Sequence, residues 1–270
     1  MTVSSLASRA SRSDSVGSRA FFEQPLNERL RTFLRLEFLY RQLRHHLELD
    51  SSWDSRVVLT AMLDIIAILS RGDVRSDVLK DLERQIGVYA QLRQQPAVDE
   101  RRLAGILRNL QTYRDQLVEL GPQYLYPLRE NEFLNAVRHR SAIPGGTCEF
   151  DLPDYTHWLR RPVKQRRDDV ENWLGGLRPL CEGVAELLWL MRAGTQTSPM
   201  VAVNGVFQHN LAREAGPCSL LRVGLAARLA VYPEISASPH RFTVRFMRWS
   251  GIASRPVQVT ENVDFDLQIC

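Results

Sequence analysis

Residues 22–39, FEQPLNERLRTFLRLEFL, decide how the first part of this chain folds. Asn27 is a good N-cap, because its side chain can accept a hydrogen bond from a free backbone N–H of a first helical turn. The apolar residues that follow recur at helical spacing: Leu30, Phe33, Leu34, Phe38 and Leu47. We therefore expect the ordered chain to begin near Phe21 and to enter a long helix at Asn27.

Helical patterns continue through the first half of the chain. Ser51 or Ser52 can cap a second helix, and Gly72 is expected to end it as a left-handed residue. Asp73 or Ser76 can start a third helix, which a linker at residues 94–98 follows. Further helices are predicted at residues 99–117, 131–140, 166–174 and 180–192.

The pattern changes at residue 143. The sequence IPGG at residues 143–146 predicts a turn that leads into a short extended segment at residues 147–150. Strands are predicted at residues 200–207, 220–225, 241–248 and 263–269. Because the helices come first and the strands last, we expect an α+β fold, with an N-terminal α-helical bundle and a segregated C-terminal antiparallel β-sheet.

This pattern divides the chain into three parts. Residues 1–20 are rich in Ser and Arg and lack the apolar stretch of a secretory signal, and we expect a disordered extension rather than a transit peptide. Residues 21–142 form the α-helical domain, and residues 143–270 form a domain of mixed helices and strands. The helices near residues 155–193 are expected to pack on the α-helical domain.

Composition excludes several classes of protein. No apolar run is long enough to cross a membrane. The net charge is +4, and only Lys80 and Lys164 among the 35 basic residues are lysines. Arginine suits the recognition of carboxylates and phosphates, but a GC-rich genome explains the bulk count more simply. The four cysteines are far apart, which predicts reduced thiols in a cytosolic protein and no zinc cluster.

Known catalytic motifs are missing from the sequence. No P-loop, GxGxxG, HExxH or GxSxG segment is present, so we expect no cofactor, no metal and no enzymatic activity. An enzyme whose catalytic groups converge from distant positions remains an open alternative.

Two basic segments are candidate binding sites. In RFTVRF, residues 241–246, strict alternation places Arg241, Thr243 and Arg245 on one strand face, with the arginines roughly 7 Å apart. Such a pair suits a carboxylate-bearing segment, although an ordinary solvated strand face has the same pattern. The second segment is Arg160, Arg161, Lys164, Arg166 and Arg167. It could contact phosphates, as the alternative of a basic nucleic-acid-binding protein requires, but a solvated loop and helix start explains it better.

Several segments together resemble the ZapD family of Z-ring-associated proteins. They are FEQPLNERLRTFLRLEFL at residues 22–39, SRGDVRSDVLKDLERQ at 70–85, VRHRSAIPGGTCEFDLPDYTHWL at 137–159, VNGVFQ at 203–208, RFTVRFM at 241–247 and VDFDLQIC at 263–270. They occur in family order and span nearly all of residues 21–270. The resemblance implies a cytoplasmic homodimer at the division site, with a helical and a β-strand part. It also implies binding to the C-terminal peptide of FtsZ, bundling of FtsZ filaments, and no cofactor, nucleic acid or membrane.

The resemblance also implies a basic pocket for the FtsZ tail. Arg71, Arg241 and Arg245 match family positions associated with that pocket. Further basic candidates from the matching motifs are Arg31, Arg35, Arg75, Arg138 and Arg140, each of which could instead form a structural ion pair. The stretch around His157 departs from the family pattern, which puts a role for His157 in doubt.

Overall fold

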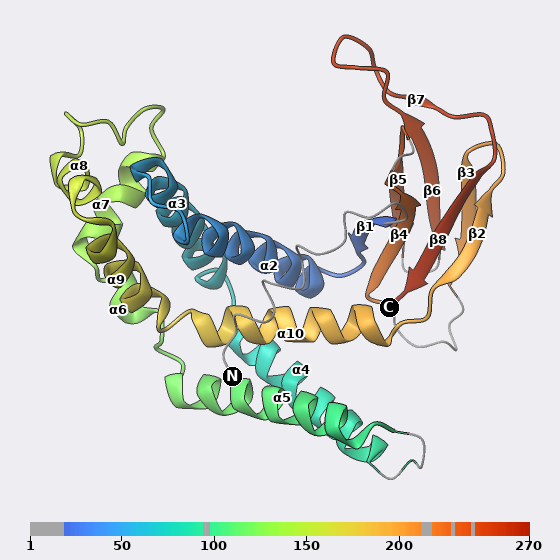
Figure 1. The fold of residues 1–270 in the computed structure, drawn as a ribbon, viewed down its shortest axis with the longest axis horizontal. Coiled ribbons are helices and arrows are strands. Elements are labelled where there is room, and N and C mark those ends of the chain that lie inside the picture. Colours follow the sequence, from blue (N-terminus) through green and yellow to red (C-terminus); the bar gives the residue numbers. More distant parts are fainter. Residues whose placement is uncertain (1–18, 94, 96–97, 212–217, 228–229, 239–240) are drawn as a thin grey trace. The chain divides into compact units, whose positions relative to one another are not determined.

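The computed structural model describes residues 19–93, 95, 98–211, 218–227, 230–238 and 241–270 (Figure 1). These residues form two compact units. The helical unit spans Thr32–Leu190, and the sheet unit combines the described residues before Thr32 with those from Met191 onward. The expected α+β fold with segregated helices and antiparallel strands is confirmed.

These units do not coincide with the expected division at residue 142. Helices α8 (Pro153–Arg160), α9 (Val163–Leu174) and most of α10 (Arg178–Gly194) belong to the helical unit, because they bury their apolar faces there. The expected disordered extension at residues 1–20 is wrong for Arg19 and Ala20, which lie in strand β1 (Arg19–Pro25). Residues 1–18 lie outside the described residues.

The helical unit is built mainly from helices that the sequence predicts. They are α2 (Glu28–Leu47), α3 (Ser52–Leu69), α4 (Val74–Leu92), α5 (Glu100–Leu120) and α7 (Glu132–Ser141), with a short α6 (Tyr126–Arg129) between the last two. The expected caps are present: Asn27 Oδ1 accepts from the N–H of Leu30 at 2.8 Å, and Asp73 Oδ1 accepts from the N–H of Ser76 at 3.1 Å. Ser51 forms a reciprocal capping box with Asp54.

Two local expectations in this unit are wrong. Gly72 is not a left-handed residue; α3 ends instead at Leu69, and the hydroxyl of Ser70 donates to the carbonyl of Ile66 at 2.7 Å. Residues 147–150 form turns rather than an extended segment. Helix α8 lies at the start of the region near residues 155–193 where helices were expected, and Pro153 at its first turn is a recognised helix start.

The sheet unit contains two packed antiparallel sheets. One sheet has the strand order β1-β4-β8-β2, and the other has β3-β6-β5 with β7 also paired to β6. The additional strands are β2 (Ser198–Ala202), β3 (Val206–Asn210), β4 (Leu220–Ala226), β5 (Val231–Ser238), β6 (Arg241–Arg248), β7 (Val257–Gln258) and β8 (Val263–Ile269). Phe246 and Phe265 meet between the sheets, with ring centroids 5.2 Å apart.

A tight turn separates β2 from β3, where the sequence pattern suggested one strand at residues 200–207. Asn204 and Gly205 both have positive φ angles, of 52° and 71°. The N–H of Val206 donates to the carbonyl of Val203 at 3.1 Å across them. An Asn-Gly pair is a strong signal for such a turn. The turn passes the chain from the sheet of β8 to the sheet of β6.

Candidate partner-binding surface

The outer face of β6 has the alternation that the sequence predicts. Phe242, Val244 and Phe246 are almost completely buried between the two sheets. Arg241 and Arg245 are exposed on the opposite face. The strand therefore anchors itself through three apolar side chains and presents two guanidinium groups to solvent from a rigid backbone.

The neighbouring strands surround these arginines with polar side chains. Residues directly opposite each other in an antiparallel pair share a face of the sheet. On this face Arg241 lies between Asn210 and Ser238, Thr243 between Gln208 and Ser236, and Arg245 between Val206 and Glu234. Glu234 is the acid opposite Arg245, but no ion pair joins Arg241 or Arg245 to any carboxylate in the described part of the chain. Both arginines are thus available to a partner.

The third candidate in the sheet unit, Arg31, has a structural contact. Its Nε is 3.3 Å from a carboxylate oxygen of Glu28, one helical turn earlier on α2. The side chain is half-buried, which limits its reach to a partner. Arg31 therefore fits the structural alternative that the sequence left open.

The five remaining arginines lie in the helical unit and have different environments. Arg75 is half-buried, and its Nε donates to the carbonyl of Leu117 at 2.9 Å, which ties α4 to the end of α5. Arg140 is 3.4 Å from Asp151. Arg35, Arg71 and Arg138 are exposed, on α2, in the α3–α4 turn and in the last turn of α7. Arg75 and Arg140 therefore have structural contacts, whereas the other three face solvent.

The basic segment at residues 160–167 is largely neutralised within the helical unit. Arg160 pairs with Glu149, Arg161 with Asp169, and Lys164 with Asp168. The interpretation as a solvated loop and helix start is wrong for Arg166, which is only 7% exposed. A cluster already engaged with carboxylates presents little free charge to phosphates.

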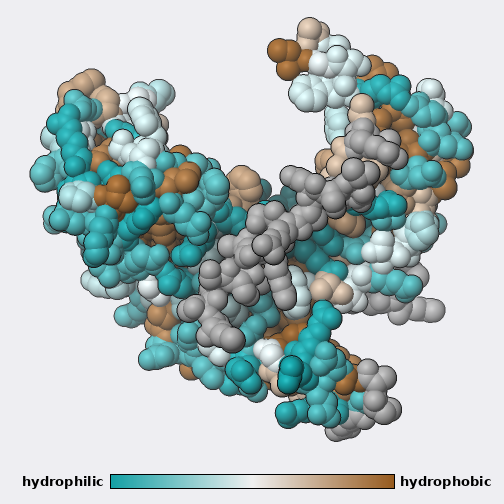
Figure 2. All heavy atoms as spheres, in the orientation of Figure 1, coloured by the Kyte–Doolittle hydropathy of each residue, from teal (hydrophilic) through white to brown (hydrophobic). Residues whose placement is uncertain are grey.

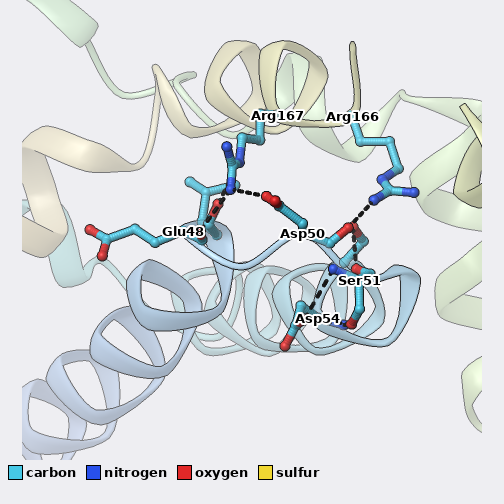
Figure 3. Close-up of polar contacts among 8 residues, drawn as sticks. Glu48, Asp50, Ser51, Asp54, Arg166 and Arg167 are labelled. Atoms are coloured by element: carbon cyan, nitrogen blue, oxygen red, sulfur yellow. Dashed lines mark hydrogen bonds and ion pairs between the residues drawn. The ribbon is translucent and has the colours of Figure 1, made fainter. Parts of the chain in front are cut away.

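Arg166 and Arg167 hold the connection between α2 and α3, as Figure 3 shows. Arg166 Nη2 donates to the carbonyl of Asp50 at 2.7 Å. Arg167 donates to the carbonyls of Leu47 and Glu48 at 2.9 and 2.7 Å, and to the Asp50 carboxylate at 2.7 Å. The carbonyls of Leu47 and Glu48 have no partner within the helix at the end of α2, so Arg167 caps α2 from a distant part of the sequence, and Arg166 holds the connection just before α3.

A partly buried ionic cluster holds the first strand of the sheet unit. Glu23 accepts hydrogen bonds from Arg192 at 2.8 and 2.7 Å and from Arg222 at 2.7 Å. Burial alone would raise the pKa of Glu23, but the two guanidinium groups hold it below its ordinary value. Because Glu23 has two partners in the fold, this charge contributes to the structure of β1 rather than to the exposed surface.

The residues that the sequence did not predict at this surface come from β3 and β5. Glu234, Ser236 and Ser238 were missed because Pro233 interrupts the strand pattern of β5. The Asn204-Gly205 turn could have revealed β3 as a separate strand. His157 is exposed on α8, which leaves its role undecided.

Among the residues that the structure describes, no group of three or more His, Cys, Asp or Glu side chains could hold a metal ion. A search of the same residues for a helix long and apolar enough to cross a membrane finds none.

Comparison with known proteins identifies a single family. A family model named ZapD and described as cell division protein matches residues 34–245. The cell division protein ZapD of Methylococcus capsulatus is 41% identical over 250 residues, which cover 92% of this chain and 97% of that protein. Proteins of the same name from Aromatoleum aromaticum and Azoarcus sp. are 37% and 35% identical over 249 residues, covering 92% of this chain and 96% and 98% of theirs.

Proposed function

This chain belongs to the ZapD family of cell division proteins, and on that premise we propose that it binds the C-terminal tail of FtsZ. In this proposal it acts without catalysis or a cofactor, in the cytoplasm at the division site. As a homodimer it cross-links FtsZ filaments and bundles them, which stabilises the Z-ring. The observation that carries the proposal is the pair Arg241 and Arg245, exposed on β6 without an ion-pair partner in the described part of the chain.

The arginine pair suits a flexible acidic tail. Each guanidinium can donate two parallel hydrogen bonds to a carboxylate, and such charge-assisted bonds are stronger than neutral ones. The packed core beneath β6 fixes the backbone spacing of the pair, so little backbone entropy is lost in the protein when the tail binds. Ordering the tail itself costs entropy, which keeps the affinity of a single site modest.

Two copies of a modest site are enough to join filaments. A filament repeats its tail along its length, so a dimer bound by one site meets a high local concentration of further tails. The contacts are exposed charge pairs, which salt screens with a Debye length of about 8 Å at physiological ionic strength. Bundling should therefore weaken steadily as salt is raised, and full bundling at high salt would contradict the electrostatic part of the proposal.

The test is co-sedimentation of this protein with polymerised FtsZ, with or without the C-terminal peptide of FtsZ. We expect co-pelleting with full-length FtsZ and its loss when the peptide is removed. Arg241→Glu and Arg245→Glu should each weaken binding by about tenfold, which corresponds to about 1.4 kcal/mol. Arg101→Glu is the matched control, because it makes the same charge change at an exposed position of α5.

Each result separates a different part of the proposal. Binding that survives removal of the peptide would show that the tail is not the target. Equal loss of FtsZ binding in Arg101→Glu and in the β6 variants would mean that the effect comes from the change in net charge alone. Failure to bind full-length FtsZ, together with tight binding to duplex or single-stranded nucleic acid, would instead support the nucleic-acid alternative.

A further inference from the structure

The exposed face of α2 combines apolar and basic side chains. Leu34, Phe38, Arg41 and His45 are three or four residues apart, so they lie along one face of the helix. Phe38 is at the centre of this face and is 66% exposed. The opposite face, which includes Phe33, Leu36 and Leu43, is buried in the core of the helical unit. Single exposed apolar side chains are common on protein surfaces, but a partner that removes the Phe38 ring from water gains free energy from its burial.

Basic residues flank Phe38 on this face and acids do not. Arg35 and Arg41 are each three residues from Phe38, and both are exposed. At about 100° per residue, the nearest acid, Glu37, points about 100° away from Phe38 around the helix, but it lies only about 40° from Arg41. The face therefore offers one apolar contact between positive charges, which complements a segment that carries both apolar side chains and carboxylates.

Two basic residues in the last turn of α2 have acidic partners within the helical unit. Arg44 is 3.5 Å from Glu171, and His46 Nδ1 is 2.8 Å from Asp54 Oδ1. For Arg35 and Arg41, by contrast, no acidic partner occurs within the described ranges. The helix thus directs some of its cations inward to carboxylates of the same unit and leaves these two on the face of Phe38.

We propose that this α2 face, made of Leu34, Arg35, Phe38, Arg41 and His45, is a contact surface for the acidic and apolar FtsZ tail, with Phe38 as its apolar anchor. The inference rests on the proposed function, and it adds an apolar determinant to a recognition so far assigned to arginines alone. An aromatic anchor surrounded by cations lets the tail bury an apolar side chain while its carboxylates remain paired.

The composition of the face favours a peptide over nucleic acid. Its two rings, Phe38 and His45, are seven residues apart, which is about 10 Å along a helix, so they do not form the run of neighbouring rings on which single-strand binding surfaces stack successive bases. Leu34 offers no stacking surface but can contact an aliphatic side chain. On the side of the molecule drawn in Figure 2, hydrophobic residues form small groups among hydrophilic ones.

The experiment measures binding of a fluorescently labelled FtsZ C-terminal peptide to the full chain by anisotropy. Phe38→Ser should weaken binding by about tenfold, as expected for the loss of a central apolar anchor. Phe38→Leu keeps an apolar side chain and should recover most of the affinity. Tyr126→Ser is the matched control, because Tyr126 is an aromatic residue of the same unit with a similar exposure of 63%, and it should bind like the wild type. Melting curves of all three variants check that they fold.

A second peptide, in which the apolar side chains of the tail are replaced by serine, tests the contact directly. Phe38→Ser should have little further effect on this peptide if Phe38 contacts those side chains. Wild-type affinity in Phe38→Ser, with binding still lost in Arg241→Glu, would overturn this inference alone. No binding of the peptide to the wild type would overturn the proposed function as well. Tight binding of a labelled oligonucleotide that Phe38→Ser abolishes would overturn the assignment of the face to a peptide.

Discussion

Replacing Arg166 by Met tests whether a buried arginine holds the helical unit together. Arg166 Nη1 donates to the carbonyls of Leu159 and Arg161, and Nη2 donates to the carbonyl of Asp50 at 2.7 Å. Methionine fills much of the same volume but donates no hydrogen bond. The variant therefore leaves the carbonyls of Leu159 and Asp50 without their arginine donor, at the end of α8 and at the α2–α3 connection.

The size of the effect follows from these contacts. A hydrogen bond to a charged group contributes about 1.5–3 kcal/mol, and Arg166 donates such bonds to the carbonyls of Leu159 and Asp50. The cost of burying the guanidinium, whose Nε has no hydrogen-bond partner, offsets part of the stabilisation by these hydrogen bonds. We expect Arg166→Met to lower the free energy of unfolding by about 3 kcal/mol, which for a unit of this size lowers Tm by roughly 6–12 °C.

Far-ultraviolet circular dichroism during heating is the assay, because the helical unit supplies most of the helical signal. Lys164→Met is the matched control: Lys164 is on the same helix, but its ion pair with Asp168 is largely exposed, and such pairs contribute little to stability. A Tm for Arg166→Met within about 2 °C of the control would refute the reasoning. It would mean that the carbonyls find water as readily as they find the guanidinium.

Two further predictions concern the sheet unit and the core of the helical unit. Gly205→Ala should destabilise the protein by at least 1 kcal/mol in urea unfolding, because φ is +71° and a Cβ there would be 2.2 Å from the carbonyl oxygen of Val259. Gly87→Ala should instead stabilise the protein by about 0.5–1 kcal/mol, because Gly87 is within α4 and a Cβ there meets open space. Burial raises the pKa of Glu186, whose carboxyl accepts from Asn109, so the folded protein binds this proton more tightly than the unfolded chain does. Stability should then fall as pH rises above the ordinary value of 4.5, and Glu186→Gln should have a higher Tm than the wild type at neutral pH but not at about pH 4. A constant difference at all pH values would contradict this account.

The helical part was predictable because its signals are local. A cap acts on N–H groups two or three residues away, and an amphipathic pattern repeats within one segment, so Asn27, Ser51 and Asp73 could be identified without knowing the fold. The alternation in β6 is local in the same sense, and it correctly placed Arg241 and Arg245 opposite the buried phenylalanines.

Strand β1 depends on a partner that is distant in sequence, and strand β5 has only a weak strand pattern of its own. β1 pairs along its whole length with β4, so residues 19–25 become a strand through hydrogen bonds to a segment about two hundred positions away. β5 carries Pro233, which weakens its strand pattern, but it pairs with β6 from Val231 to Ser238. A segment that is stabilised by hydrogen bonds to a strand elsewhere in the chain needs no strong strand pattern among its own residues.

The sequence by itself determined the fold class, the family and the pair of arginines on β6. Only the tertiary structure decided which arginines are available to a partner. Arg166 and Arg167 bind backbone carbonyls at the α2–α3 connection, whereas Arg35 and Arg41 have no acidic partner in the described chain. Spacing along the chain cannot separate these cases, because an arginine side chain is long and its nearest acceptor is set by how the helices pack.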